Sequence, residues 1–473
     1  MSHMPPSPIT ETSTAASRTL AAAIKHVMNR TPLYVAPSAT VGEAAQQMTA
    51  AGVSYALVSA DPPGIITDRD LRGRVLAVGR GPQTPVAQIM SRPLKTIDSD
   101  RPIYTALLVM VEEGIHHLAV VEEGAIVGLV SDAHLMRQQS HSPIYLQSKV
   151  ESLAQSELLA EYGAEITDTV EALLLGNLGV SQIGQIVSSL NDMLAKRLLR
   201  LAEAELGPPP TPYAWIVFGS EGRLEQALLT DQDNALIYAE ESEAARAYFG
   251  KLAQKVIDGL IRAGFPPCPG GYMATNWRHP LAEWEAIFAA WVRKPEPQAL
   301  LEASIFFDFR PVHGELSLEP LEMILVSAQH EPLFRRLMLQ NALEFHPPLN
   351  FFKRVRCDGD GMVDIKKGGV APIVGLARAT SLAAGSLERS TLERLAISAE
   401  SGTISQEGAD RLAETLEFLL RLRLRQQLAA ARAGQTPSNK VAWDELSALE
   451  RRNLRAAFVT IEQMQNGISS AFR

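Results

Sequence analysis

Residues 214–238 read AWIVFGSEGRLEQALLTDQDNALIY and combine an apolar strand pattern, a turn of small residues and two acidic side chains. The pattern predicts a strand, a turn at Gly219-Ser220, a short helix and a second strand that begins with Asp231 and Asp233. Because side chains alternate along a strand, the two carboxylates are expected on one face. This order of elements predicts an α+β domain with two acids beside a glycine turn.

The two carboxylates and the turn together indicate a site for a metal ion and phosphates. Neighbouring carboxylates repel each other unless a cation lies between them. Mg²⁺, or Mn²⁺ in its place, is bound by such a pair together with the phosphates of a substrate. Backbone N–H groups of the turn at Gly219, the Ser220 hydroxyl and the Arg223 guanidinium are expected to bind those phosphates. An isolated Asp-x-Asp is more often a turn or a cap, so its spacing from the Gly-Ser turn and the flanking strands carry the prediction.

The segment resembles the nucleotidyltransferase signature of the polymerase-β superfamily, in which glycine-serine is followed after a short helix by Asp-x-Asp. From Gly219 to Tyr238 it looks like a bacterial family of nucleotidyltransferases related to the uridylyltransferase of the P-II nitrogen-signalling protein. The resemblance implies a polymerase-β-like mixed sheet with helices, in which Asp231 and Asp233 are catalytic and hold the metal.

The superfamily supplies a third carboxylate from a later strand, which makes Asp308 the candidate. This residue lies in the aromatic-rich segment SIFFDFR, residues 304–310, which predicts a strand. As a third metal ligand, Asp308 would help to hold two ions and would act as the general base toward the attacking hydroxyl. An ordinary ion pair with Arg310 is the alternative interpretation.

Further residues lie in motifs that resemble those around the family's active-site cleft. Arg278 or Lys294 could contact phosphate and Trp277 could stack on a base, with a buried tryptophan and two solvated cations as the alternative. Lys366 lies in DIKKGG, residues 364–369, which resembles a lysine-glycine motif of uridylyl- and adenylyltransferases and implies phosphate binding. A plain surface turn is the alternative for this lysine.

An internal repeat with an offset of about 62 residues precedes this domain. The apolar pattern that begins at Val41 recurs from Ile103, and each copy predicts an amphipathic helix closed by a glycine, Gly52 or Gly114. Two short strands are expected after each helix. The repeat therefore predicts two copies of one helix-and-strand unit.

The repeat resembles a tandem pair of cystathionine-β-synthase (CBS) domains over residues 22–140, a pair that often precedes the catalytic domain in the family named above. The match includes GIITDRDL at 64–71 and GLVSDAHL at 128–135, each a strand that enters a helix. CBS pairs commonly bind adenosine nucleotides, which makes such a nucleotide the expected ligand of this region.

In CBS domains a Thr or Ser followed one helical turn later by Asp holds the ribose. The first copy keeps this pair as Thr67 and Asp70, whereas the second copy has His134 in place of the acid. A neutral imidazole cannot accept hydrogen bonds from two hydroxyls at once, so one nucleotide site is expected rather than two. A simple helix cap is the alternative for Thr67 and Asp70.

Helical periodicity covers much of the remaining chain. Pro208-Pro209-Pro210 cannot continue a helix, so a new domain is expected near Tyr213. The expected organisation is a disordered lead at 1–20, the CBS pair at 22–140, connecting helices at 143–206, the catalytic domain at 211–315 and a C-terminal helical bundle for substrate recognition at 316–473.

Composition narrows the class of protein. With 46% hydrophobic and 21% charged residues, the 473-residue chain has the profile of a soluble globular protein. No apolar run approaches the roughly 20 residues that span a bilayer, and no signal peptide is expected. Cys268 and Cys357 are too few for a disulfide framework, which fits the cytoplasm. A net charge of −9 argues against general nucleic-acid binding.

Together these features predict a Mg²⁺-dependent enzyme that moves a nucleoside monophosphate from a nucleoside triphosphate to a hydroxyl of a protein or a small molecule. An adenosine nucleotide at the CBS pair would regulate it, and a homodimer is expected. The alternative is a catalytically inactive nucleotide sensor that uses the transferase fold as an interaction module. The joint presence of Ser220, Asp231 and Asp233 with an acidic candidate at Asp308 favours activity.

Overall fold

The computed structural model describes residues 20, 22–131, 143–152, 156–176, 178–226, 228 and 231–471. These residues form two compact units, one up to Gln147 and one from Ser148 onward. Both contain mixed sheets with helices, which confirms the α+β multidomain class. The expectations for residues 1–19 and for His134 lie outside the described residues. None of the helices in these ranges combines the length and the hydropathy needed to cross a membrane.

The first unit contains two three-stranded sheets with the same topology. In each sheet the first strand is parallel to the second, and the second is antiparallel to the third. The elements are η1 (Ile24–His26), β1 (Tyr34–Val35), α2 (Val41–Ala51), β2 (Tyr55–Val58), β3 (Gly64–Thr67), α3 (Asp68–Asp70), η2 (Leu71–Leu76), η3 (Val86–Gln88), β4 (Thr96–Asp98), α4 (Ile103–Glu113), β5 (His117–Glu122) and β6 (Ala125–Ser131). The repeat in the sequence is therefore a repeat in the fold.

The main helices of the repeat end as the sequence predicts. α2 and α4 are followed by Gly52 and Gly114, each in the left-handed conformation with φ of 65°. Glycine is favoured there because a Cβ would clash with the backbone in this conformation. The buried faces of the two helices contribute to separate hydrophobic cores, one for each copy.

The residues that precede each copy complete the core of the other copy. Met28 belongs to the core of the second copy, and Met90 belongs to the core of the first. A Cβ at Gly128 would lie 2.8 Å from the Met28 sulfur, and a Cβ at Gly64 would lie 2.9 Å from the Met90 sulfur. These two crossed contacts make the pair of copies one packed unit.

The second unit is built around a four-stranded sheet with the order β10-β7-β8-β9, in which only β8 and β9 are parallel. α6 (Pro143–Ser152) runs across the division between the units. The elements that follow are η4 (Ser156–Glu161), α7 (Tyr162–Leu175), α8 (Val180–Leu206), β7 (Tyr213–Val217), α9 (Gly219–Gly222), β8 (Asn234–Tyr238), α10 (Glu243–Arg262), β9 (Arg278–Pro280), α11 (Leu281–Arg293), α12 (Pro297–Phe306), β10 (Arg310–Gly314), α13 (Glu319–Ser327), η5 (Ala328–His330), α14 (Pro332–Glu344), β11 (Met362–Asp364), η6 (Lys366–Val370), α15 (Ala371–Ala383), α16 (Thr391–Glu400), α17 (Gln406–Arg432), β12 (Lys440–Ala442), η7 (Trp443–Glu445) and α18 (Ala448–Ala471).

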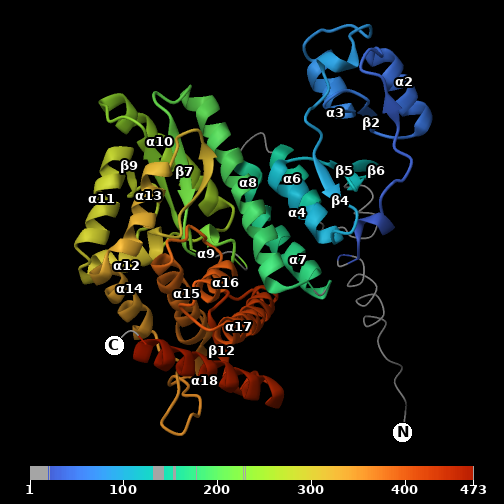
Figure 1. Ribbon diagram of the computed structural model, residues 1–473. Coiled ribbons are helices and arrows are strands. Elements are labelled where there is room, and N and C mark those ends of the chain that lie inside the picture. Colours follow the sequence, from blue (N-terminus) through green and yellow to red (C-terminus); the bar gives the residue numbers. More distant parts are fainter. Residues whose placement is uncertain are drawn as a thin grey trace, which may run out of the picture. The chain divides into compact units, whose positions relative to one another are not determined.

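Alternation along β7 and β8 sends side chains into two helical layers. On one face, Ile216 packs in a core that includes Trp284 of α11 and residues of α12, α13 and α14. On the other face, Tyr213 and Tyr238 contact the ring of Phe249 in α10. Figure 1 shows α11 and α13 on one side of the sheet and α8 on the other.

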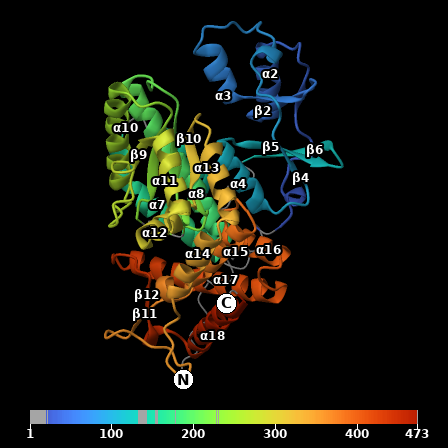
Figure 2. The ribbon, with the colours of Figure 1, turned by 60° about the vertical axis from the view of Figure 1, so that its left-hand side comes forward.

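The helices ahead of the sheet belong to the same unit as the sheet. α8 ends at Leu206, before the triple proline, as predicted. The unit does not divide at the prolines, because α8 packs against α10 and α17. Figure 2 shows α15, α16, α17 and α18 gathered at one end of the sheet. The connecting helices and the C-terminal helices thus share one packed body with the sheet.

Candidate active site

The turn after β7 and the start of β8 lie side by side. Val217 pairs with Asn234, and the Phe218 N–H donates to the Asp233 carbonyl at 3.2 Å. Gly219 has a φ of 62°, and a Cβ there would lie 2.8 Å from Asp233 Oδ2. A side chain at position 219 would therefore fill the space between the turn and the carboxylate.

All of the transferase-site residues predicted from the sequence except Asp308 line one cavity of about 430 Å³. The predicted residues that line it are Gly219, Ser220, Arg223, Asp231, Asp233 and Lys366. Apolar side chains of the C-terminal helices, among them Met338, Phe345 and Val374, form another part of the wall. The cavity thus combines polar groups at the end of two central strands of the sheet with an apolar surface.

The two acids differ in their environment. Asp231 is exposed, whereas Asp233 is partly buried, and burial raises the pKa of Asp233 to about 6 against the opposing effect of Lys366. A bound cation would favour the ionised form of such a carboxyl group. Among the residues that the structure describes, no three His, Cys, Asp or Glu side chains come together as metal ligands. The pair fits Mg²⁺ in the mode in which substrate phosphates supply the remaining ligands.

Three cationic side chains share the cavity with these acids. Arg223 follows α9 and Arg378 lies in α15, with exposed fractions of 9% and 6%. Lys366 begins η6, and burial together with the nearby Arg423 holds its pKa below the ordinary value. Arg223 and Arg378 pair with Asp308 and Lys366 is exposed, and three cations that line one cavity favour an anionic ligand there.

Asp308 lies outside the cavity, and the segment around it is not the predicted strand. α12 ends at Phe306 and β10 begins at Arg310, so Asp308 occupies the short connection between them. The neighbouring phenylalanines are buried in the core, which explains the aromatic-rich pattern. Arg310 pairs with Asp192 of α8 at 2.6 Å, so the alternative ion pair between Asp308 and Arg310 is also wrong.

Three arginines enclose the fully buried Asp308 carboxylate. Nη1 of Arg223 donates to Oδ2 at 2.6 Å and Nη1 of Arg394 donates to Oδ1 at 2.6 Å, while Arg378 donates to both oxygens. Burial alone would raise the pKa of Asp308, but the arginines hold it well below its ordinary value. A carboxylate held in this way is available neither as a metal ligand nor as a general base. The structure corrects that prediction and gives Asp308 the role of orienting Arg223 and Arg378.

Arg378 and Arg394 were not predicted from the sequence. Arg378 is the only charged residue in the apolar helix APIVGLARATSLA, and a charge in such a helix requires a partner. That isolation is a signal in the sequence. The partner lies 70 positions earlier in the chain, and no local pattern connects the two.

The other candidates for substrate contact lie elsewhere in the unit. Trp277 packs against Phe306 and Trp284 with ring centroids 4.5 and 5.8 Å apart. Arg278 begins β9 and Lys294 follows α11, and neither belongs to the described lining of the cavity. The alternative interpretation is a buried tryptophan and two solvated cations. Trp277 packs against the core but is only partly buried, Arg278 is also partly buried, and Lys294 is exposed, so the alternative is confirmed for Lys294 alone.

Thr67 and Asp70 line a cavity of about 850 Å³ in the first unit. The Thr67 hydroxyl donates to Asp70 Oδ2 at 2.8 Å and accepts from the Asp70 N–H at 3.4 Å, so the pair caps α3. The cap is therefore confirmed, and it does not exclude a ligand because the same pair borders the cavity. Arg69, Arg74 and Lys95 also line this cavity and favour an anionic molecule.

The site thus combines a mixed sheet, two acids that precede one of its central strands and C-terminal helices that complete the cavity. Residues 164–298 match the family "Putative nucleotidyltransferase DUF294", 332–472 match "Putative nucleotidyltransferase substrate binding domain", and 24–77 and 86–141 match "CBS domain". The chain belongs to the CBS-domain-containing proteins and carries both parts of this transferase family. The cavity draws Asp231 and Asp233 from the first part and Lys366 and Arg378 from the second.

Curated relatives match portions of the chain. The CBS domain-containing protein YhcV of Bacillus subtilis is 32% identical over 110 residues, which are 23% of this chain and 79% of YhcV. An uncharacterized protein of Methanopyrus kandleri is 28% identical over 140 residues, which are 28% of this chain and 71% of that protein. The CBS domain-containing protein CBSCBSPB3 of Arabidopsis thaliana is 29% identical over 173 residues, which are 36% of this chain and 28% of that protein.

Solved structures also match a part of the chain. An uncharacterized conserved protein from Pyrococcus horikoshii is 33% identical, with 25% of this chain and 96% of that chain covered and a TM-score of 0.24. A CBS domain protein from Pyrobaculum aerophilum, solved in complex with AMP, is 24% identical, with 25% and 93% covered and a TM-score of 0.23.

Replacing Asp308 by Asn should destabilise the second unit. The free energy of unfolding should fall by about 3–5 kcal/mol, because three buried arginines lose their shared anion. Urea unfolding followed by circular dichroism measures the change. Glu205→Gln is the control, since it removes one charge of an exposed ion pair and should cost less than about 1 kcal/mol. Equal losses in the two variants would contradict the role assigned to Asp308.

Replacing Asp233 by Asn should stabilise the metal-free protein. The raised pKa means that folding disfavours the ionised form, so the wild type loses stability between about pH 4 and pH 6 and the variant does not. The gain should be about 1–3 kcal/mol above pH 6 and should vanish toward pH 4. Thermal unfolding in EDTA across this pH range tests it, with Glu240→Gln beyond the far end of β8 as control. A gain that does not depend on pH would refute the explanation.

Proposed function

We propose that the chain is a Mg²⁺- or Mn²⁺-dependent nucleotidyltransferase, similar to uridylyl- or adenylyltransferases, that transfers a nucleoside monophosphate to a hydroxyl group. The observation that carries this proposal is the set of residues that line a single cavity. Two carboxylates, a glycine-serine turn and three cations, of which Arg223 and Arg378 are buried, line it together. The matched transferase family and the resemblance to the uridylyltransferase of the P-II protein agree with this activity.

Different residues of the cavity would bind different parts of the nucleotide. Arg223, Arg378 and Lys366 would bind the triphosphate, and the backbone at Gly219 with the Ser220 hydroxyl would add donors. The apolar wall from the C-terminal helices would receive the nucleoside and exclude water from the reacting phosphate. Because guanidinium groups already held by Asp308 need little reorientation, the phosphates would meet a preorganised site.

The reaction would join the acceptor oxygen to the α-phosphorus and break the bond from that phosphorus to the oxygen of the leaving pyrophosphate. The hydroxyl proton would pass to solvent. A divalent ion held by Asp231 and Asp233 would supply charge neutralisation on the phosphate and a lower pKa for the attacking hydroxyl. Arg223, Arg378 and Lys366 would stabilise the charge that develops on the leaving pyrophosphate.

The first unit would bind an adenosine nucleotide as a regulator. Asp70 would accept hydrogen bonds from ribose hydroxyls, and Arg69, Arg74 and Lys95 would contact phosphate. We expect one site per chain, because the first copy has Asp70 whereas the second copy has His134 at the equivalent position.

An inactive nucleotide sensor is the second candidate. It is favoured because, within the described part of the chain, no third ligand completes a metal site with Asp231 and Asp233, and Asp308 is enclosed by arginines instead. An inactive sensor would bind triphosphates without turnover, so an assay of transfer separates the two candidates.

Asp231→Asn and Asp233→Asn should each lower Mg²⁺-dependent transfer by about 100-fold or more, because asparagine keeps the shape of the side chain but lacks the anion that holds the metal. Incubation with each labelled ribonucleoside triphosphate and a cell extract, followed by separation of labelled products, measures transfer. Glu240→Gln is the control, as it removes a carboxylate beyond the far end of β8. Full activity of Asp231→Asn, or binding without turnover in the wild type, would favour the inactive sensor.

Asp70→Asn should weaken adenosine nucleotide binding by about tenfold or more, because the amide accepts fewer hydrogen bonds than the carboxylate. Calorimetry with AMP, ADP and ATP measures the affinity and should give one site per chain. Glu43→Gln is the matched control, since Glu43 forms the equivalent capping box of α2 and does not belong to the described lining of the cavity. Equal weakening in both variants would mean that loss of the cap, rather than of a ligand contact, causes the effect.

A further inference from the structure

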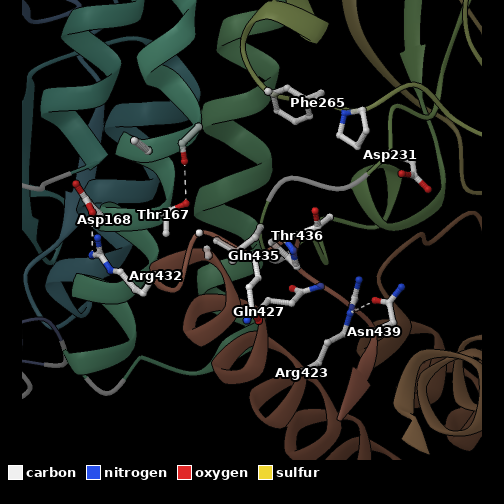
Figure 3. A pocket seen from close by; sticks show the side chains of 18 of the residues that line it. Thr167, Asp168, Asp231, Phe265, Arg423, Gln427, Arg432, Gln435, Thr436 and Asn439 are labelled. Carbon is white, nitrogen blue, oxygen red and sulfur yellow. Dashed lines mark hydrogen bonds and ion pairs between the residues drawn. The ribbon is translucent and has the colours of Figure 1, made fainter. Parts of the chain in front are cut away.

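A second cavity of the same unit, here called the α17 cavity, adjoins the first at Asp231 and Lys366, which line both. Its volume is about 790 Å³. Its walls come from α7, from the segment that follows α10, and from α17 together with the residues after α17. Figure 3 shows Arg423, Gln427 and Asn439 on one side of the space and Thr167 on another, with Asp231 at an edge.

Arg423 brings a buried positive charge to this cavity. Its exposed fraction is 3%, and its Nε donates to Asn439 Oδ1 at 2.8 Å. Within the described ranges of the chain it forms no ion pair, unlike Arg432 nearby, which pairs with Asp168 at 2.8 Å. Burial and the proximity of Arg223 lower the pKa of Arg423 to about 10. Asp364 opposes this shift without pairing with the guanidinium, which therefore has no direct anionic partner at its buried position.

Gln427 adds a hydrogen-bond acceptor to which no donor of the described residues binds. It lies one helical turn after Arg423 on α17, and its exposed fraction is also 3%. Its Oε1 has no hydrogen-bond partner among the described residues. An unsatisfied buried polar atom is costly, and a hydroxyl or N–H of a ligand would remove that cost. The cavity thus presents a cation and an acceptor on one helical face.

We propose that the α17 cavity binds the acceptor substrate, and that this acceptor is a small molecule with a hydroxyl group and an anionic group, either phosphate or carboxylate. The assignment of an acceptor rests on the function proposed above. The anionic group contacts Arg423 and a hydroxyl donates to Gln427. A second hydroxyl, or the same one after rotation, reaches the phosphorus beside Asp231.

The position of the cavity supports an acceptor rather than a second part of the nucleotide. The glycine-serine turn, Asp233 and Arg378 line only the first cavity, whereas Asp231 lies at the boundary. A molecule in the α17 cavity would therefore reach Asp231 from a side that the glycine-serine turn, Asp233 and Arg378 do not line. A neutral hydroxyl of a protein side chain would leave Arg423 without an anion, which favours a small anionic acceptor.

Calorimetry on the full chain tests the proposal with inorganic phosphate, glycerol 3-phosphate and glycerate as probes, in the presence of Mg²⁺ and a non-hydrolysable triphosphate that fills the first cavity. The wild type should bind at least one probe. Comparing its affinities for glycerol 3-phosphate and glycerate shows whether the site prefers phosphate or carboxylate. Arg423→Gln should weaken that binding by about tenfold or more, because a charge-assisted contact is lost. The affinity for the triphosphate should change little.

Gln427→Glu tests the same site while keeping Arg423, so its result does not depend on whether the protein folds without that arginine. The new carboxylate would lie one turn from Arg423 and pair with it, which should raise the melting temperature and block the probes. Gln426→Glu makes the same charge change at a neighbouring position outside the described lining, and should leave probe binding unchanged.

Absence of any probe binding, or binding unaffected by both Arg423→Gln and Gln427→Glu, would overturn the proposal. So would a transfer assay in which proteins are the only labelled acceptors. Failure of the transferase function gives a different result, since the triphosphate would then not bind or turn over while the probes still bound in an Arg423-dependent way. That result would support an anion-binding site at Arg423 and contradict its role as an acceptor site.

Discussion

The second unit depends on a single buried carboxylate. Asp308 lies between the sheet and the C-terminal helices, and its three arginines come from the turn after α9, from α15 and from α16. Each guanidinium would be costly to bury without this anion, and the anion would be costly to bury without them. The sheet and the helices therefore stabilise each other's position. The arginines that face the cavity are oriented by a residue that does not belong to its described lining.

Several cations around the two cavities of this unit lie close enough to repel one another. Burial and nearby cations lower the pKa of Lys366, Arg394 and Arg423, with Asp308 opposing the effect at Arg394. Repulsion among these groups makes the ligand-free protein less stable than its packing alone would allow. An anion that binds them relieves this repulsion, so ligand affinity and the stability of the unit are linked.

The sequence was sufficient for the parts of the fold that depend on local patterns. The repeat, the glycines that close α2 and α4, and the turn between β7 and β8 could all be read from spacing and residue type. Asp308 could not be placed in this way, because buried phenylalanines look the same in a strand and in a helix end that enters a core. Arg378 contacts a residue far away in the chain, and only the folded structure shows that contact. The same holds for the boundary between the units, since proline marks the end of a helix but not of a packed body.

The crossed contacts of the repeat also affect how its two copies fold. Met28 and Met90 each complete the core of the copy to which they do not belong in sequence, so neither copy alone can bury its full apolar surface. Two separate chains that each carried one copy could form the same contacts only by associating, at a rate set by their concentration. Joining the copies in one chain replaces that bimolecular encounter with the closure of a short loop, which corresponds to an effective concentration in the millimolar range. The tandem arrangement thus makes assembly of the first unit independent of how much protein a cell contains.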